Sequence, residues 1–186
     1  GVLNAPSLAN AVYLHPLTWS QASISSLEDQ LRRPMFGVEP VEMGMSGAEQ
    51  EIVDRLNAEP RYRELFDAAF PDAVEPMDLD HVRLALASFV RSLVSARSPF
   101  DAFLQGDPTA ISEPARRGSE LFFSQRLGCG RCHAGFALTV AVVSEASGTD
   151  LPDAYHNIGL YDLDGAGGYP EAAPGLIAET GIGRDM

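Results

Sequence analysis

Cys129 and Cys132 are the two cysteines of the chain, and His133 follows the second of them directly. Two thiols at this spacing can add across the vinyl groups of a haem, and the imidazole that follows then lies under the porphyrin, where its nitrogen can bind the iron. The motif therefore predicts a covalently attached c-type haem, with Cys129 and Cys132 as its attachment points and His133 as an axial ligand of the iron.

Three other kinds of site use the same residue types: a redox dithiol, half of a zinc site, and a disulfide between near neighbours. A thioredoxin-like dithiol belongs at a strand-to-helix turn of a βαβ unit, and no such alternation surrounds the motif. A structural zinc ion usually needs four Cys or His ligands, whereas the other three histidines are far from the motif in the sequence. The sequence favours haem and leaves the three alternatives open.

The composition is that of a globular protein, with 45% hydrophobic residues in a chain of 186. The formal charge of −13 argues against nucleic acid and anionic membrane surfaces as partners and favours a basic partner protein. No apolar run approaches the roughly 20 residues of a membrane span, so an integral membrane protein is not expected. The chain has neither an initiator Met nor a signal peptide, although haem is normally attached outside the cytoplasm. We therefore predict a fragment of a longer bacterial protein that is periplasmic or otherwise exported.

The elements that must position the motif are mostly helices, because strand-like alternation is nearly absent. Ser25 with Glu28, and Ser46 with Glu49, are capping-box patterns that each predict the start of a helix. Pro34 is expected to end the first of these helices. The sequence thus predicts a mainly α fold.

The longest helix is predicted to begin after Asp78, which can cap it, and to follow another helix over about residues 61–70. His81 is expected on its solvated side. Its apolar residues recur three or four apart and predict one stripe that faces the core: Leu79, Val82, Leu86, Phe89, Val90, Leu93 and Val94.

The haem motif itself is preceded by a predicted helix that Ser112 caps and that leads directly into Cys129. Residues 98–101 break the preceding helix, and residues 101–111 are predicted to be a linker. Residues 138–143 form a short apolar run that is either a strand or haem packing, which periodicity does not separate. From residue 148 to residue 183 the high Gly, Pro and Asp content predicts a long loop.

Seven further short motifs surround the haem motif in a fixed order. They are Asn4-Ala-Pro-Ser-Leu-Ala-Asn-Ala, Leu17-Thr-Trp, Pro34-Met-Phe-Gly, Pro40-Val-Glu-Met-Gly-Met, Leu84-Ala-Leu-Ala-Ser-Phe, Ser98-Pro-Phe-Asp and His156-Asn-Ile-Gly-Leu-Tyr. With these motifs the chain closely resembles the di-haem cytochrome c peroxidase superfamily, and within it the MauG and MbnH-like branch. The resemblance covers nearly the whole length.

The resemblance implies a cytochrome c-like haem domain with additional helices, as part of a two-domain di-haem peroxidase architecture. Residues 1–100 would complete the first, peroxidatic haem domain and the region between the haems. Residues 101–111 would be the linker, and residues 112–186 would form the second cytochrome domain, truncated at its C-terminal end. The first haem motif is expected upstream of Gly1. The distal ligand of the second haem, Met in the peroxidases or Tyr in the MauG type, is expected beyond Met186.

Glu42 matches the glutamate that the family places over the open face of the first haem. Cleavage of hydrogen peroxide needs a proton to move from one oxygen to the other, and one carboxylate within reach of both oxygens can move it. We expect Phe36, Met43 and Met45 to form a pocket that desolvates this carboxylate. The residue by itself leaves a solvated loop glutamate as the alternative. MauG itself carries Gln at the matching place, so Glu42 favours peroxidase-like proton handling.

Trp19 is the single tryptophan of the chain, and the family places a tryptophan between its haems, where an indole can relay an electron from the second haem to the first. A packed core aromatic is the alternative. Asn4 matches an asparagine that helps to bind calcium between the haem domains, although one Asn is not a site. His15 is expected near Trp19 as a surface residue or a partner of a haem propionate. His156 lies in a family-like segment near the haem, but the family takes its distal ligand from further along the chain.

The resemblance implies an enzyme, a di-haem oxidoreductase similar to cytochrome c peroxidase. It would reduce hydrogen peroxide with electrons from a small cytochrome c or a cupredoxin, or use peroxide to oxidise a specific protein substrate, as in the MauG and MbnH-like branch. The expected cofactors are the haem c attached here, a second haem in the intact protein, and calcium as a further candidate. The fragment alone is expected to be inactive. The alternative is a mono-haem electron-transfer domain without enzymatic activity, which predicts no second haem motif in the intact protein.

Overall fold

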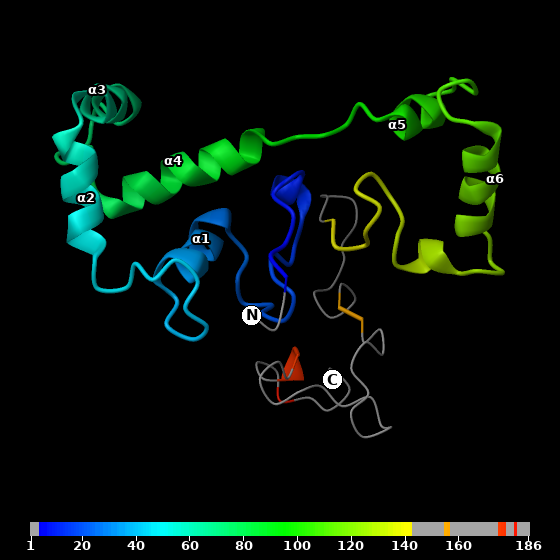
Figure 1. Cartoon of the computed structure of the whole chain (residues 1–186), viewed down its shortest axis with the longest axis horizontal. Coiled ribbons are helices and arrows are strands. Elements are labelled where there is room, and N and C mark those ends of the chain that lie inside the picture. The colour runs from blue at the N-terminus through cyan, green and yellow to red at the C-terminus, as the bar shows by residue number, and fades with distance from the viewer. Residues whose placement is uncertain (1–3, 143–154, 157–174, 178–180, 182–186) are drawn as a thin grey trace.

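The computed structural model describes residues 4–142, 155–156, 175–177 and 181. Over these ranges the chain forms six α-helices, two short 3-10 helices and no β-strand, which confirms the predicted mainly α fold (Figure 1). None of the helices in this described part is long and apolar enough to span a bilayer. The bounds are η1 Ala11–Tyr13, α1 Leu27–Phe36, α2 Glu49–Ala58, α3 Pro60–Ala69, α4 Leu79–Ser92, α5 Pro99–Leu104, α6 Glu113–Phe122 and η2 Cys129–Arg131.

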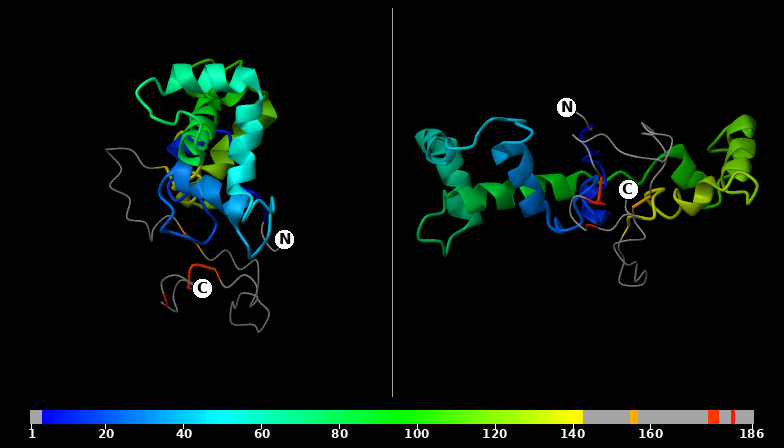
Figure 2. Two further views of the ribbon diagram at one scale, coloured as in Figure 1. Left: turned by 90° about the vertical axis from the view of Figure 1, so that its left-hand side faces the viewer. Right: turned by 90° about the horizontal axis from the view of Figure 1, so that it is seen from below.

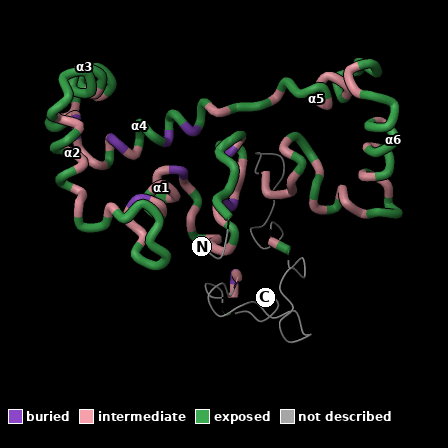
Figure 3. The backbone as a smooth tube through the Cα atoms, viewed as in Figure 1, coloured by how far each residue is buried: buried purple, intermediate pink, exposed green. Residues whose placement is uncertain are grey.

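The apolar core lies where α1, α4 and η1 meet (Figure 3). Ala87 of α4 is completely buried, and its small side chain lets α1 approach the α4 backbone. An ion pair closes the same contact, because Arg91 of α4 donates two hydrogen bonds to the Glu28 carboxylate of α1, at 2.6 and 3.0 Å. The core residues are Ala11, Leu17, Leu27, Ala87 and Val90, with Leu14 and Leu31 packed against them.

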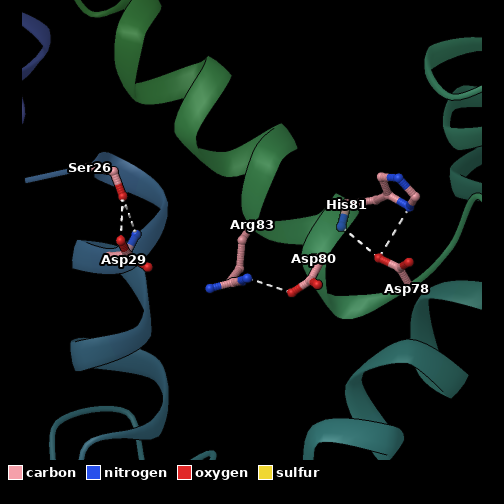
Figure 4. A network of polar contacts seen from close by, with 6 residues as sticks. All are labelled: Ser26, Asp29, Asp78, Asp80, His81 and Arg83. Carbon is pink, nitrogen blue, oxygen red and sulfur yellow. Dashed lines mark hydrogen bonds and ion pairs between the residues drawn. The ribbon is translucent and has the colours of Figure 1, made fainter.

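Helices α4 and α6 begin at the capping residues that were predicted from the sequence. Asp78 caps α4, as predicted, and its carboxylate accepts from the backbone N–H of His81 at 2.7 Å (Figure 4). Ser112 caps α6, also as predicted, with its hydroxyl accepting from the N–H of Ala115. Each cap satisfies one of the unpaired N–H groups of the first helical turn.

The predicted starts of α1 and α2 were wrong in detail. The cap of α1 is Ser26 and not Ser25, and its hydroxyl accepts from the N–H of Asp29 at 3.1 Å. Ala48 precedes α2 without a side-chain cap, so Ser46 does not open that helix. Pro34 does not end α1, which continues to Phe36. A proline in the last turn removes only one helical hydrogen bond, and the helix tolerates that loss.

The predicted stripe on α4 is only partly buried. Val82 and Val90 are buried, and Val90 belongs to the core with Leu27 of α1, whereas Leu86 is partly exposed and Phe89 is 60% exposed. The prediction for His81 was also wrong: its ring is only 21% exposed, and it packs on Phe70 with the ring centroids 4.0 Å apart. The periodicity of the apolar residues identified the helix correctly. It did not show which residues of the stripe are buried by α1.

A short helix forms at the predicted break after α4. Ser98 and Asp101 form a complete capping box that starts α5, so residues 101–104 of the predicted linker are helical. The hydrogen bonds from the Ser98 hydroxyl and backbone N–H lower the pKa of Asp101. Whether residues 101–111 separate two domains stays a prediction.

An N-terminal segment, residues 4–24, lies between the α1–α4 core and the segment that carries the haem motif (Figures 1 and 2). On the core side, the Asn10 side chain exchanges two hydrogen bonds with the Ser95 backbone, each 2.8 Å long. On the other side, the N–H of His15 donates to the Ala141 carbonyl at 2.7 Å, and Leu14 forms an antiparallel bridge with Val142. This segment therefore fixes the position of the haem motif relative to the core.

Candidate haem-binding site

The turn between α6 and the cysteines is compact and internally hydrogen bonded. Gly128 donates its N–H to the Ser124 carbonyl at 3.1 Å and adopts a left-handed conformation, φ 69°, which glycine tolerates without strain. This conformation starts η2, whose first residue is Cys129. Helix α6 thus ends at Phe122, with six residues between it and Cys129, and this turn connects it to the motif instead of the helix running directly into it as predicted.

His133 is oriented by a hydrogen bond that leaves one ring nitrogen free. Its Nδ1 lies 3.1 Å from the main-chain oxygen of Leu138. A carbonyl oxygen can only accept, so Nδ1 carries the proton, and in the neutral imidazole Nε2 then keeps its lone pair. Hydrogen bonds from the N–H of His133 to the Cys129 carbonyl and from the N–H of Val140 to the Cys132 carbonyl hold the two sides of the loop together. The imidazole is therefore in the tautomer that can bind a metal through Nε2.

Aromatic side chains from α6 pack against the motif. The ring of Phe122 lies 6.0 Å from the ring of His133, centroid to centroid. A Cβ at Gly130 would lie 3.1 Å from the Phe123 ring, so the motif needs glycine there for this close packing. Phe123 also stacks on Phe100 of α5, with centroids 6.4 Å apart and nearly parallel rings. Packing as well as the chain connection joins α5, α6 and the motif.

The residues present fit a c-type haem. Both thiols are free, and the imidazole beside them has an unprotonated nitrogen directed away from its backbone partner. In the described part of the chain, no three His, Cys, Asp or Glu side chains converge as metal ligands. A tetrahedral zinc ion needs such convergence, whereas a covalent haem needs two thiols and one axial nitrogen. The donor set thus fits haem better than zinc.

Trp19 and Asn4, two further candidate residues, lie together. The indole Nε1 of Trp19 donates to the main-chain oxygen of Asn4 at 2.6 Å. The indole is 59% exposed, so it is not packed into the core that the described residues form. Whether it relays electrons or packs in the intact protein stays a prediction. The Thr18 hydroxyl holds the turn by accepting from the N–H of Gln21 and donating to its carbonyl.

Glu42 lies away from these residues, in the loop between α1 and α2. That loop and the haem-motif loop are on opposite sides of the N-terminal segment (Figure 1). Glu42 is exposed, and Met43 is 58% exposed. The expected desolvating pocket is therefore not formed by the residues that the structure describes. Backbone hydrogen bonds from Met43 to Pro34 and from Met45 to Met35, each 3.0 Å, fix the loop to the end of α1.

The segment after the motif does not form the predicted strand as far as residue 142, and haem packing stays a prediction. Up to Val142 it consists of turns and one isolated bridge, and residue 143 lies outside the described residues, as does most of the predicted loop 148–183. Tyr155 contacts the N-terminal segment through a 3.4 Å hydrogen bond to the Thr18 carbonyl, and His156 is exposed. The role of Leu138 was not predictable from the sequence, because a backbone carbonyl that orients a histidine leaves no signal in side-chain type.

Comparison with known proteins places the chain in a family. The family model for di-haem cytochrome c peroxidase matches residues 1–109. The chain belongs to the di-haem cytochrome c peroxidase family. This membership confirms the resemblance found in the sequence. Members of this family are named for two haems and for peroxidase activity.

Individual members of the di-haem cytochrome c peroxidase family match most of the chain. Methylamine utilization protein MauG of Methylorubrum extorquens is 36% identical over 173 residues, which are 93% of this chain and 44% of that protein. Cytochrome c551 peroxidase of Pseudomonas aeruginosa is 30% identical over 138 residues, 74% of this chain and 38% of that protein. The chain spans about half the length of the relatives it matches.

A solved structure agrees with the fold over nearly the whole chain. The crystal structure of a MauG-like protein associated with microbial copper homeostasis superposes with a TM-score of 0.89 at 39% sequence identity. The match covers 98% of this chain and 52% of that one. The arrangement of helices described above is thus shared with a MauG-like protein.

Proposed function

We propose that the intact protein is a c-type di-haem oxidoreductase that reduces hydrogen peroxide or uses peroxide to oxidise a partner protein. The observation that carries this proposal is the hydrogen bond from His133 Nδ1 to the Leu138 carbonyl beside two free thiols. It supports a haem attached through thioether bonds to Cys129 and Cys132, with His133 Nε2 on the iron. When bound, such a haem supplies one-electron redox chemistry.

Glu42 is the proposed proton carrier of the peroxide reaction. Its carboxylate is exposed on a loop that backbone hydrogen bonds fix to α1, so it is available to a reactant bound by the half of the protein outside this chain. A carboxylate near a bound peroxide accepts a proton from one oxygen and donates it to the other, which then leaves as water. The fixed loop keeps Glu42 in place for both transfers.

Trp19 is the proposed electron relay between the two halves. Its indole is exposed while its Nε1–H is held by the Asn4 carbonyl, so the ring is accessible and yet oriented. Because Trp19 belongs to the segment that joins the core to the haem-motif loop, it is well placed to connect two redox centres. Asn4 is proposed as one calcium ligand, with the other ligands outside this chain.

Glu42 favours peroxidase-like proton handling, whereas two other observations favour the protein-oxidising version of the activity. The identity to MauG and to the MauG-like structure, 36% and 39%, exceeds the 30% identity to the cytochrome c551 peroxidase. The solved MauG-like protein is associated with copper homeostasis, so a protein substrate in that process is a second candidate beside a cytochrome or cupredoxin donor. Because haem is covalently attached outside the cytoplasm, we place the intact protein in the periplasm.

The test is peroxide-dependent oxidation of a reduced c-type cytochrome by the intact protein and by Glu42→Gln. We expect the variant to lose about 100-fold or more in rate, the usual effect of removing a positioned acid-base group. Glu39→Gln is the matched control, because Glu39 is an exposed carboxylate in the same loop. An equal loss in both variants, or no loss in either, removes Glu42 from the reaction.

Counting haems separates the enzyme from the mono-haem alternative. A pyridine haemochrome assay on the intact protein is expected to give two haems per chain. One haem per chain would exclude the di-haem enzyme and leave an electron-transfer domain.

A further inference from the structure

Charge is distributed unevenly between the two ends of the molecule. Residues 49–80, which include α2 and α3, contain ten acidic and three basic residues. Residues 121–142, which include the haem motif, contain Arg126 and Arg131 and no acidic residue, in a chain of formal charge −13. The two segments lie at opposite ends of the ribbon (Figure 1). The surface beside the motif is thus locally basic although the protein is acidic.

Both arginines beside the motif are free to meet a partner. Arg126 and Arg131 are exposed, and neither forms an ion pair within the part of the chain that the structure describes. By contrast, Arg116 and Arg117 on α6 share the carboxylate of Glu113. Among the described residues, the positive charge of Arg126 and Arg131 is therefore not paired, and an external carboxylate can bind it.

An exposed apolar residue lies between the two arginines in the sequence. Leu127 is 52% exposed and immediately precedes the Gly128 turn. The Ser124 hydroxyl accepts from the N–H of Leu127, and the N–H of Arg131 donates to the Gly128 carbonyl, so this turn holds all three side chains on one short loop. An apolar centre with a charged rim is the usual composition of a transient protein interface.

We propose that Arg126, Leu127 and Arg131 form the docking surface for an acidic redox protein. The proposal rests on the proposed function, because it gives the haem at Cys129 and Cys132 its electron partner. The docked protein, a small cupredoxin or cytochrome with an acidic surface, gives up one electron and is oxidised, and the ferric haem iron takes up that electron and is reduced. At about 0.15 M ionic strength, charges are screened beyond roughly 8 Å. A docked protein is therefore attracted by Arg126 and Arg131 more strongly than it is repelled by the distant acidic residues of segment 49–80. The partner is thus expected to be acidic, whereas the net charge alone favours a basic partner.

The experiment uses the intact, haem-loaded protein and a reduced blue-copper protein with an acidic surface. The dissociation constant is measured by NMR titration, and the rate of haem reduction by stopped flow, both at about 0.15 M salt. We expect Arg126→Glu with Arg131→Glu to weaken binding and slow reduction by about tenfold or more. The control, Arg55→Glu with Arg61→Glu on α2 and α3, makes the same change in net charge and is expected to alter either value less than about twofold.

The wild-type protein provides a second measurement that does not depend on folding of the variants. The acidic donor is expected to bind more tightly than a basic c-type cytochrome, and the reverse order overturns the proposal. Equal effects of the two double variants, Arg126→Glu with Arg131→Glu and Arg55→Glu with Arg61→Glu, also overturn the proposal. A change of oligomeric state in Arg126→Glu with Arg131→Glu overturns it too, because it would assign the surface to a second copy of the chain. These outcomes are distinct from failure of the proposed function, in which the protein lacks a haem that dithionite can reduce.

Discussion

Leu138 holds a left-handed backbone conformation, φ 52°, while its carbonyl accepts the hydrogen bond from His133 Nδ1 at 3.1 Å. A residue with a Cβ pays about 1–2 kcal/mol for this conformation. Hydrogen bonds on either side keep it there: the N–H of Leu138 donates to the Gly135 carbonyl, and the N–H of Val140 donates to the Cys132 carbonyl. The strain therefore lies in the residue that fixes the tautomer of the proposed iron ligand.

This relationship predicts different effects for two substitutions at residue 138. Leu138→Gly removes the strain and keeps the carbonyl, so the free energy of unfolding should change by less than about 1 kcal/mol, since Leu138 is half-exposed and little packing is lost. Leu138→Val places a β-branched side chain in the left-handed region and should lower the free energy of unfolding by about 1–2 kcal/mol. Denaturant unfolding of the holoprotein measures both. Equal effects of the two variants would show that the conformation carries no strain.

The contact between Gly130 and Phe123 predicts a second pair of effects. Gly130→Ala places a methyl group 3.1 Å from the Phe123 ring and should cost about 1–3 kcal/mol of stability through overpacking. Combination with Phe123→Leu should recover part of this cost, because the smaller side chain leaves room. Gly118→Ala in α6 is the control, since a Cβ there has no neighbour within 4 Å, and alanine should raise stability by about 0.5–1 kcal/mol. Strict additivity of the double variant would contradict the contact.

The ion pair between α1 and α4 predicts a dependence of stability on pH. The hydrogen bonds from Arg91 lower the pKa of Glu28 below its usual value of 4.5. Because the folded pKa is the lower one, the stabilisation is fully present above about pH 4.5 and is lost as the pH falls through the folded value. Both side chains are partly exposed, so Glu28→Gln should cost only about 0.5–1 kcal/mol at pH 7. The difference between wild type and variant should disappear once the pH has fallen below the lowered pKa of Glu28 in the folded state. A difference that stays constant with pH would assign the effect to packing.

The sequence predicted the fold where the signals were local and unique. Asp78 and Ser112 each stand alone before a helical pattern, and both cap a helix. Ser25 and Ser26 are neighbours with acidic residues three positions on, so the capping pattern fits both, and only the burial of Leu27 selects Ser26. On α4, periodicity gave the helix but not its covered side, because Ala87 is buried by tertiary packing that no local pattern encodes.

The candidate site was predictable in its chemistry and not in its geometry. Residue type and spacing identified Cys129, Cys132 and His133, because covalent haem attachment requires that pattern. The orienting carbonyl of Leu138 was not predictable, since any residue type supplies a carbonyl. The local charge beside the motif was visible in the sequence, yet the net charge of −13 concealed it.

The central claim is that Cys129 and Cys132 carry a haem. Mass spectrometry of the proteolytic fragment that contains both cysteines tests it most directly, using intact protein expressed with the cytochrome c maturation machinery. The account predicts a fragment heavier by one haem, and an unmodified mass in Cys129→Ala with Cys132→Ala. A wild-type fragment with two unmodified thiols would contradict the account.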